Sequence, residues 1–228
     1  MRVKTLFAAF GGILFAGSLA AQPQLLPTAK VPAPAAVQTP PLTAPAPTPE
    51  DLLNLDLSTG GRVVIQLRPD IAPKHVERIK TLARRSFYNG HLFHRVIEGF
   101  MAQTGDPTGT GTGGSDLPDL AAEFNTQPHL RGTVAAARAQ DPNSANSQFY
   151  IMLAPRFSLD GNYTVLGRVL SGMQYVDAIE RGEPPANPSR ILQASIAADN
   201  LPPPPAGATP PAPAMAPQQP QQAQPTPQ

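Results

Sequence analysis

The sequence predicts a mainly β fold, an antiparallel barrel of eight strands that is closed on itself and capped by two α-helices. Three observations lead to this prediction. Short segments of alternating apolar and polar residues recur through the middle of the chain, turn residues separate most of them, and only two segments have helical spacing. A closed antiparallel barrel suits this number of strands. Composition alone does not separate such a barrel from a β-sandwich.

The first two strands are predicted to form a hairpin. In the segment 53–57, leucines alternate with Asn54 and Asp56, which is the period of a half-buried strand. Gly60 and Gly61 then turn the chain, and apolar alternation resumes over 63–67. Two alternating segments joined by a short glycine turn are typical of a β-hairpin.

Two segments have the spacing of amphipathic helices. Asp70 is suited to cap the first, Pro73 lies in its first turn, and Asn89–Gly90 ends the segment. The second helix is predicted over 173–181, with Gly182 just past its end.

The other strand-like segments are short and apolar, and a polar, glycine-rich stretch follows the first of them. They span 92–103, 133–139, 149–153, 163–170 and 191–197.

Proline-rich stretches flank this predicted core. Nine prolines lie in 22–49 and eleven in 200–228, out of 30 in the chain. Both stretches are poor in large apolar residues, so they bury too little surface to offset the entropy of ordering. The predicted organisation is a signal peptide (1–20), a proline-rich disordered linker (21–49), a folded domain (50–199) and a disordered tail rich in Pro, Gln and Ala (200–228).

The N-terminus has the pattern of an export signal. Arg2 and Lys4 form a short positive region, 6–17 is apolar, and 18–20 supplies small residues where a signal peptidase cleaves. The apolar run is shorter than the ~20 residues that a spanning helix needs. We expect cleavage after Ala20 or one residue later, and an uncleaved membrane anchor is the alternative.

Composition argues against several classes of function. The formal net charge of +1, without a basic stripe, gives no reason to expect a nucleic-acid partner. The absence of cysteine excludes disulfides and thiolate catalysis. No cofactor and no metal are expected: His91 and His94 lie three residues apart, but neither His75, His129 nor a nearby carboxylate completes a recognisable ligand set.

The glycine run 109–114 fits the letter pattern of a dinucleotide-binding loop. Such a loop must open a helix whose N-terminus holds the phosphates. The following segment, 115–119, is acidic and interrupted by Pro118, so we expect a flexible surface loop instead. The Gly-x-Ser-x-Gly elbow of serine hydrolases does not occur in the sequence.

The segment 93–103 (FHRVIEGFMAQ) combines residue types that have no ordinary packing reason to occur together. In an extended chain Arg95, Met101 and Gln103 share one parity and face one side, although Gly99 makes the parity uncertain. Two interpretations follow from residue chemistry alone. The segment is a functional site, or it is a barrel strand whose Arg95 reaches solvent.

Three blocks of the sequence resemble the cyclophilin-type peptidyl-prolyl isomerases. The segment 93–103, with Gly105–Asp106 and the glycine loop after it, is similar to the signature of that family. The segment 141–151 resembles its second signature in the bacterial form, and 159–169 also fits. The blocks follow in the expected order, and the resemblance covers about 53–197.

The resemblance implies an eight-stranded antiparallel barrel capped by two helices, and a peptide substrate that contains X–Pro. It implies that Arg95 is the catalytic guanidinium and that Gln103 hydrogen-bonds the substrate backbone. For substrate binding it implies Phe100, Met101, Phe149 and Leu159 in the proline pocket, Ala137 and Arg138 through their backbone, and Tyr163 where many members have histidine.

Two departures from the family pattern bear on selectivity. The chain has no tryptophan, and Phe157–Ser158 occupies the rim position where the family usually has one, which implies weak cyclosporin binding. Arg138 stands where asparagine is common in eukaryotic members.

The sequence thus predicts an exported, monomeric prolyl isomerase that acts on proline-containing polypeptides without forming a covalent bond. Its expected location is the periplasm, where it would assist the folding of exported proteins. The alternative is a non-catalytic, peptide-binding chaperone or adaptor that uses the same groove. The presence of both Arg95 and Gln103 favours the enzyme.

Overall fold

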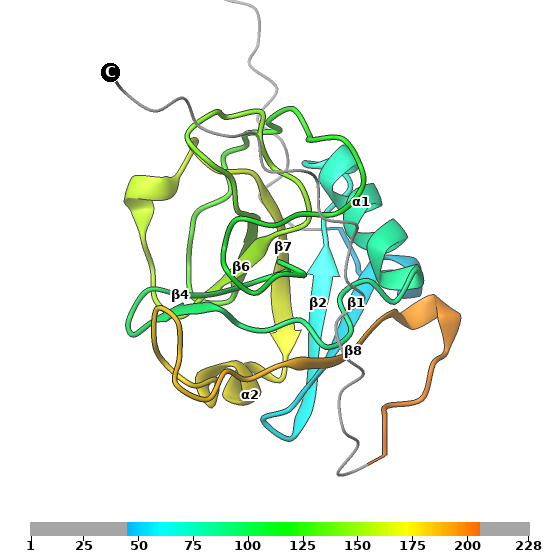
Figure 1. Cartoon of the computed structure of the whole chain (residues 1–228). Helices are drawn as coiled ribbons and strands as arrows, with labels where there is room; N and C mark the ends of the chain where they lie inside the picture. The colour runs from blue at the N-terminus through cyan, green and yellow to red at the C-terminus, as the bar shows by residue number, and fades with distance from the viewer. Residues whose placement is uncertain (1–44, 206–228) are drawn as a thin grey trace, which may run out of the picture. The chain divides into compact units, whose positions relative to one another are not determined.

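The computed structural model describes residues 45–205, which form an eight-stranded antiparallel sheet with two α-helices and three 3-10 helices (Figure 1). The predicted signal peptide, nearly all of the predicted linker and residues 206–228 lie outside the described residues. The strands are β1 (Leu52–Leu57), β2 (Gly61–Leu67), β3 (Arg95–Ile97), β4 (Met101–Thr104), β5 (Thr133–Ala136), β6 (Phe149–Met152), β7 (Val165–Ser171) and β8 (Ile191–Ile196). The helices are η1 (Pro49–Asp51), α1 (Pro73–Arg84), η2 (Phe157–Leu159), α2 (Met173–Asp177) and η3 (Ala197–Asp199).

The sheet is a curled half-barrel, with strand order β3-β4-β6-β5-β7-β2-β1-β8. The prediction of a closed barrel is wrong, because the end strands β3 and β8 do not pair with each other. Backbone hydrogen bonds join the segment before β3 to the start of β8 and the residues just before it: Gly90 N to Ile191 O (2.7 Å), Ile191 N to His91 O (3.0 Å) and Phe93 N to Ser189 O (2.9 Å). Strand β3 has three residues, and Gly90, with φ +84°, turns the chain before it, so no continuous ladder extends to β8.

The hairpin of β1 and β2 forms as predicted, but β1 is buried on both faces rather than half-buried. Asn54 and Asp56 are only 8% and 4% exposed, although they alternate with leucines that belong to the main core. Asp56 accepts two hydrogen bonds at 2.8 Å each from Arg62, its cross-strand partner. A paired, bidentate arrangement of this kind makes the burial of a carboxylate tolerable.

The N-terminus of α1 is capped by a residue distant in sequence. Asp70, which the sequence predicted as the cap, instead forms an ion pair with Arg68 at 2.7 Å. The Glu123 carboxylate accepts the backbone N–H groups of Lys74 (3.1 Å) and His75 (3.0 Å), and it lies 2.7 Å from the Nδ1 atom of His75. A negative group at this position also interacts favourably with the helix dipole.

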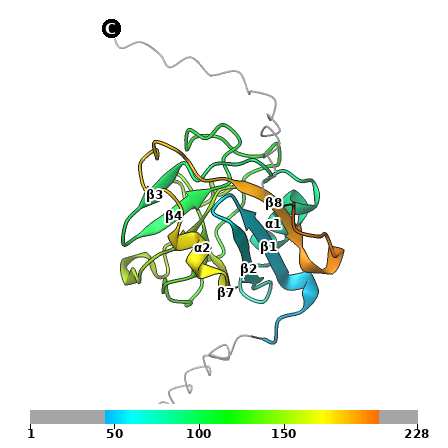
Figure 2. The same ribbon diagram turned by 90° about the horizontal axis from the view of Figure 1, so that it is seen from below.

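The second helix is shorter than predicted, since α2 ends at Asp177 and not near Arg181. The residues that follow form a loop that runs beside β3 and leads into β8, as Figure 2 shows. The two helices lie at opposite ends of the curled sheet, with α1 packed on β8 and α2 on β2 (Figure 1). Neither helix within residues 45–205 has the length and apolar character needed to cross a membrane.

Apolar side chains form two clusters, one on each face of the strands β4, β5 and β6. The main core lies between the sheet and the helices. The second, smaller cluster is formed by Met101, Ala135, Tyr150, Met152 and Val165. Burial on both faces explains why these strands are almost continuously buried, without the polar alternation of a solvated sheet.

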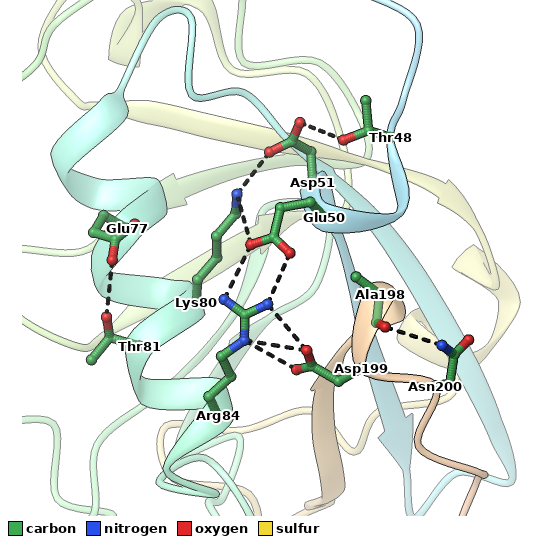
Figure 3. Close-up of polar contacts among 10 residues, drawn as sticks. All are labelled: Thr48, Glu50, Asp51, Glu77, Lys80, Thr81, Arg84, Ala198, Asp199 and Asn200. Atoms are coloured by element: carbon green, nitrogen blue, oxygen red, sulfur yellow. Dashed lines mark hydrogen bonds and ion pairs between the residues drawn. The ribbon is translucent and has the colours of Figure 1, made fainter.

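A network of ion pairs joins both ends of the folded domain to α1 (Figure 3). Arg84 lies 2.8 Å from Glu50 and 3.1 Å from Asp199, and Lys80 lies 2.8 Å from Asp51. The network connects η1, α1 and η3, so the 3-10 helices at the two ends of the folded domain are both attached to α1. The pairs of Arg84 are largely exposed, and such pairs stabilise by about 0–1 kcal/mol each, whereas Lys80 is buried beside Asp51.

The Glu123 cap predicts a pH-dependent contribution to stability. Burial alone would raise the pKa of Glu123, but hydrogen bonds from the His75 ring and from the Lys74 and His75 backbones lower it below its ordinary 4.5. A carboxylate with a lowered pKa stabilises the fold fully above its unfolded value, and this stabilisation is lost as the pH falls through the lowered value. Glu123→Gln should therefore lower the free energy of unfolding by about 1–2 kcal/mol near neutral pH.

Urea unfolding of wild type and Glu123→Gln, near pH 7 and near pH 3, measures this contribution. The difference should shrink at the lower pH. Glu77→Gln, on the same helix but outside the cap, is the matched control and should change little. Equal stability of Glu123→Gln and wild type at neutral pH would contradict the role of Glu123.

Candidate active site

Three polar side chains lie in one row across neighbouring strands. Arg95 on β3 pairs with Gln103 on β4, and Gln103 pairs with Tyr150 on β6. Cross-strand partners in antiparallel strands have their side chains on the same face. Met101, two residues before Gln103, is on that face as well, so the parity predicted for the segment is maintained across the turn at 98–100.

This row forms part of the wall of a cavity of about 110 Å³. The cavity is lined by Arg95, Phe100, Met101, Gln103, Ala137, Arg138, Tyr150, Leu159 and Tyr163. The structure therefore brings together eight of the nine residues that the resemblance implied, although they come from separate parts of the chain. Tyr150 is the one lining residue that was not predicted.

Phe149 is the predicted pocket residue that does not line the cavity. Phe149 is 1% exposed, and its ring lies in the main core, edge-on to Tyr88 with ring centroids 5.6 Å apart. Successive side chains of a strand point to opposite faces. Because Phe149 points into the core, the next residue, Tyr150, points to the cavity, and the expectation for Phe149 is corrected to Tyr150.

A second glutamine fixes the orientation of Gln103. The side-chain amide of Gln103 donates to Gln148 Oε1 at 2.8 Å, and Gln148 donates to the carbonyls of Gly111 (3.0 Å) and Gly113 (2.8 Å). Gln148 was not predicted as a site residue, although it lies within the second signature block. The Ala137 N–H donates to the carbonyl of Gln148 at 3.0 Å, so Ala137 can offer a peptide only its own carbonyl.

The glycine loop surrounds a carboxylate of the chain itself. Asp106 accepts backbone N–H groups from Thr108 (2.7 Å), Thr110 (3.1 Å), Gly111 (2.6 Å) and Gly113 (3.2 Å). Burial alone would raise the pKa of Asp106, but these hydrogen bonds and that of the Thr108 hydroxyl lower it. The loop that fits the dinucleotide-binding letter pattern is thus ordered around the aspartate of the chain itself, rather than being the flexible surface loop that was expected.

Arg138 forms one side of the cavity through its side chain as well as its backbone. Its guanidinium lies 4.6 Å from the ring centroid of Tyr163 and donates to the carbonyl of Asn162 at 3.0 Å. It also donates to the carbonyls of 139–140. A guanidinium stacked on an aromatic face and bonded to several carbonyls is well suited to hold two loops together.

Tyr150 gives its wall of the cavity a polar component. The Tyr150 hydroxyl lies 3.2 Å from His129 Nε2, and His129 Nδ1 lies 2.8 Å from Asp160. Burial raises the pKa of Tyr150, so the phenol keeps its proton at physiological pH. Asp160 precedes the loop that carries Tyr163, so this buried contact also supports the opposite wall of the cavity.

His91 and His94 are buried and do not line the cavity. Burial lowers the pKa of His91 to about 4 and also lowers that of His94, so both rings are neutral near pH 7. Within residues 45–205, histidine, aspartate and glutamate side chains do not gather in groups of three or more that could hold a metal ion.

Comparison with known proteins gives the family. The model of the family described as "Cyclophilin type peptidyl-prolyl cis-trans isomerase/CLD" matches residues 53–196. The chain belongs to the cyclophilin family. This cyclophilin is 51% identical over 173 residues to a probable peptidyl-prolyl cis-trans isomerase of Brucella suis, across 69% of this chain and 88% of that protein. It is therefore a peptidyl-prolyl cis-trans isomerase.

Solved structures agree with this membership. A cyclophilin from Hirschia baltica is 30% identical, with a TM-score of 0.63, over 68% of this chain and 77% of that one. A cyclophilin-type isomerase from Cryptosporidium parvum, solved in the presence of the dipeptide Ala-Pro, is 26% identical with a TM-score of 0.60, over 64% of this chain and 98% of that one. The curled eight-stranded sheet with two helices is thus the cyclophilin fold.

Because Tyr150 lines the cavity and Phe149 lies in the core, substitutions at these two neighbouring positions should have different effects. Phe149→Leu should lower the free energy of unfolding by about 1–1.5 kcal/mol, because it leaves a void in the core, with little change in kcat/KM. Tyr150→Leu should lower kcat/KM for a proline peptide about tenfold, because it removes an aromatic ring from the cavity wall. Urea unfolding and an isomerisation assay on both variants measure the contrast. An equal loss of activity in both would place Phe149 in the site after all.

Proposed function

We propose that this cyclophilin accelerates X–Pro rotation by a non-covalent mechanism in which Arg95 donates a hydrogen bond to the prolyl nitrogen. The observation that carries this proposal is the shared cavity. Arg95 and Gln103 lie side by side on one wall, and Phe100 and Met101 provide apolar surface next to them. A charged donor beside an apolar pocket is the combination that the reaction needs.

The chemistry explains why an arginine is suited to this position. The imide bond has partial double-bond character because nitrogen shares its lone pair with the carbonyl, which gives a barrier of about 18–20 kcal/mol. A donor directed at the prolyl nitrogen localises that lone pair and weakens the double bond. Arginine keeps its charge at any relevant pH and carries its donors in a fixed planar fork.

The cavity is of a suitable size for the proline ring. An apolar cavity of about 150 Å³ holds a benzene ring, so about 110 Å³ has room for a smaller five-membered ring. The Cryptosporidium relative was solved with a peptide that ends in proline, which supports proline-containing polypeptides as the substrates here. Met101 and Leu159 would grip the ring while the carbonyl of the preceding residue rotates.

Gln103 would hold the peptide backbone. Its amide nitrogen is engaged by Gln148, so its Oε1 is left to accept an N–H group of the substrate. Arg138 would contribute its backbone, as the resemblance implies, and its side chain would keep the adjoining loops in place. These contacts hold the peptide on both sides of the rotating bond.

The guanidinium accounts for part of the rate and the pocket for the rest. A hydrogen bond to a charged group is worth about 1.5–3 kcal/mol, which corresponds to about 10–200-fold in rate. Catalysis requires that the twisted state be bound more tightly than either planar state. A preorganised, partly dry cavity strengthens each polar contact and would supply the remaining stabilisation.

Arg95→Ala tests this mechanism. We expect kcat/KM for a proline tetrapeptide to fall by about 10–200-fold, with the far-ultraviolet circular dichroism unchanged because Arg95 is on the surface. Arg131→Ala is the matched control: both arginines form exposed ion pairs, with side chains 42% and 46% exposed, but Arg131 pairs with Asp177 outside the cavity. Near-normal turnover of Arg95→Ala would contradict the proposal.

We also propose that this isomerase is exported and acts on the folding of proteins of the cell envelope or of secreted proteins. The pattern of Arg2, Lys4, the apolar run 6–17 and the small residues 18–20 supports this location. Export places an isomerase where newly translocated chains fold, and uncatalysed proline isomerisation takes about 10–100 s at 25 °C.

Expression of the full chain in a Gram-negative host tests export. We expect the mature protein in the periplasmic fraction, with a first residue of Ala21 or Gln22. Leu14→Arg interrupts the apolar run and should keep the protein in the cytoplasm. An uncut chain in the membrane fraction would support the anchor alternative, and an uncut cytoplasmic chain would contradict export.

A further inference from the structure

The loop between α2 and β8 covers the outer edge of the catalytic strand. Residues 181–185, which we call the strap, lie beside β3, and Figure 2 shows the loop passing next to that strand. Val96 and Gly182 exchange two backbone hydrogen bonds, of 2.8 and 2.9 Å. The strap thus adds a short antiparallel pairing on the side of β3 that does not face β4.

This pairing sets Glu183 directly opposite Arg95. In an antiparallel pairing, the residue before Val96 faces the residue after Gly182. The register is realised in the side chains, because Arg95 Nε donates to Glu183 Oε2 at 2.7 Å. Glu183 therefore extends the row of Arg95 and Gln103 by one residue, on the side of Arg95 that is away from Gln103.

A second ion pair fixes the other side of the strap without touching the site. Arg181 Nε donates to Glu98 Oε2 at 2.7 Å. In this ion pair the strap provides the arginine, whereas in the Arg95–Glu183 pair it provides the carboxylate. Neither Glu98 nor Arg181 lines the cavity. Glu98 thus provides an internal control for any effect that arises only from holding the strap.

The shape of the strap depends on glycine at position 182. Gly182 has φ +147°, and a Cβ there would lie 2.5 Å from Pro185 Cα. A side chain at this position would push the strap away from β3 and take Glu183 with it. Gly182 was expected just past the end of a helix, but α2 ends at Asp177, and the requirement for glycine comes from the close approach of Pro185.

The Arg95–Glu183 pair is too exposed to be explained by stability alone. The two side chains are 42% and 50% exposed, and surface ion pairs of this kind add little to folding stability. The effect of the ion pair on the orientation of the Arg95 side chain matters more than its effect on stability. An arginine side chain on the surface has many rotamers, and one charge-assisted hydrogen bond to Nε fixes the plane of the guanidinium. The pair uses only the Nε–H donor, and within residues 45–205 the two terminal amino groups of Arg95 have no other partner.

We propose that Glu183 is a positioning residue for isomerisation. Its carboxylate holds Nε–H of Arg95 on the outer side of the row, so that the terminal amino groups face the cavity and the prolyl nitrogen. This proposal rests on the role of Arg95 in the proposed function. Glu183 does not contact the substrate, and it acts only through the orientation of the guanidinium.

The test compares variants of the full chain in a proline-tetrapeptide isomerisation assay. Glu183→Ala should lower kcat/KM about tenfold, and Glu183→Gln, which keeps a neutral acceptor for Nε–H, about threefold. Glu98→Gln should stay within about twofold of wild type. The dissociation constant of the same peptide, measured by titration, should change by less than about twofold in Glu183→Ala, since positioning acts on the twisted state.

A double-mutant cycle separates positioning from a general structural effect. In the Arg95→Ala background, Glu183→Ala should cause no further loss, because the group that it orients is absent. Thermal unfolding of each variant shows that the fold is retained. Independent losses that multiply in the double variant would overturn the proposal.

The outcomes distinguish this inference from the proposed function. If Arg95→Ala loses activity as expected while Glu183→Ala keeps or exceeds wild-type activity, Glu183 is not a positioning residue and the role of Arg95 stands. If Arg95→Ala itself is fully active, the mechanism under the proposed function fails, and the inference about Glu183 fails with it.

Discussion

The antiparallel register among β3, β4 and β6 is the constraint on which the site depends. It places Arg95, Gln103 and Tyr150 in one row and thereby chooses which face of each strand meets the substrate. The opposite face belongs to the main core, so a slip by one residue would exchange catalytic and core side chains. The large, fully buried residues of that core, such as Phe149, make the slipped alternative costly.

Internal carboxylates support this arrangement from outside the row. Asp106 gathers the N–H groups of the glycine loop, two carbonyls of that loop hold Gln148, and Gln148 holds Gln103. Glu123 plays a comparable part at the N-terminus of α1. In each case an anion of the chain satisfies backbone donors that would otherwise lack partners, as buried polar groups require.

The open edge of the sheet connects the fold to catalysis. An unpaired edge strand exposes hydrogen-bonding groups that folded proteins commonly cover. Here β3 does not join β8, and the loop before β8 covers it instead through the Val96–Gly182 pairing. The same pairing that covers the edge also brings Glu183 to Arg95. The ion pair at the guanidinium therefore depends on the sheet being open at β3.

The sequence by itself determined the elements and most of the site. Local periodicity predicted the first hairpin and α1, and the resemblance to the family implied nine site residues, of which eight line the cavity. What only the tertiary structure decided were contacts between residues far apart in the chain: Glu123 as the cap of α1, Glu183 beside Arg95, and Tyr150 rather than Phe149 in the pocket. A pattern in one segment specifies its own period, but the face that it buries and the partner that it meets depend on how other segments pair with it.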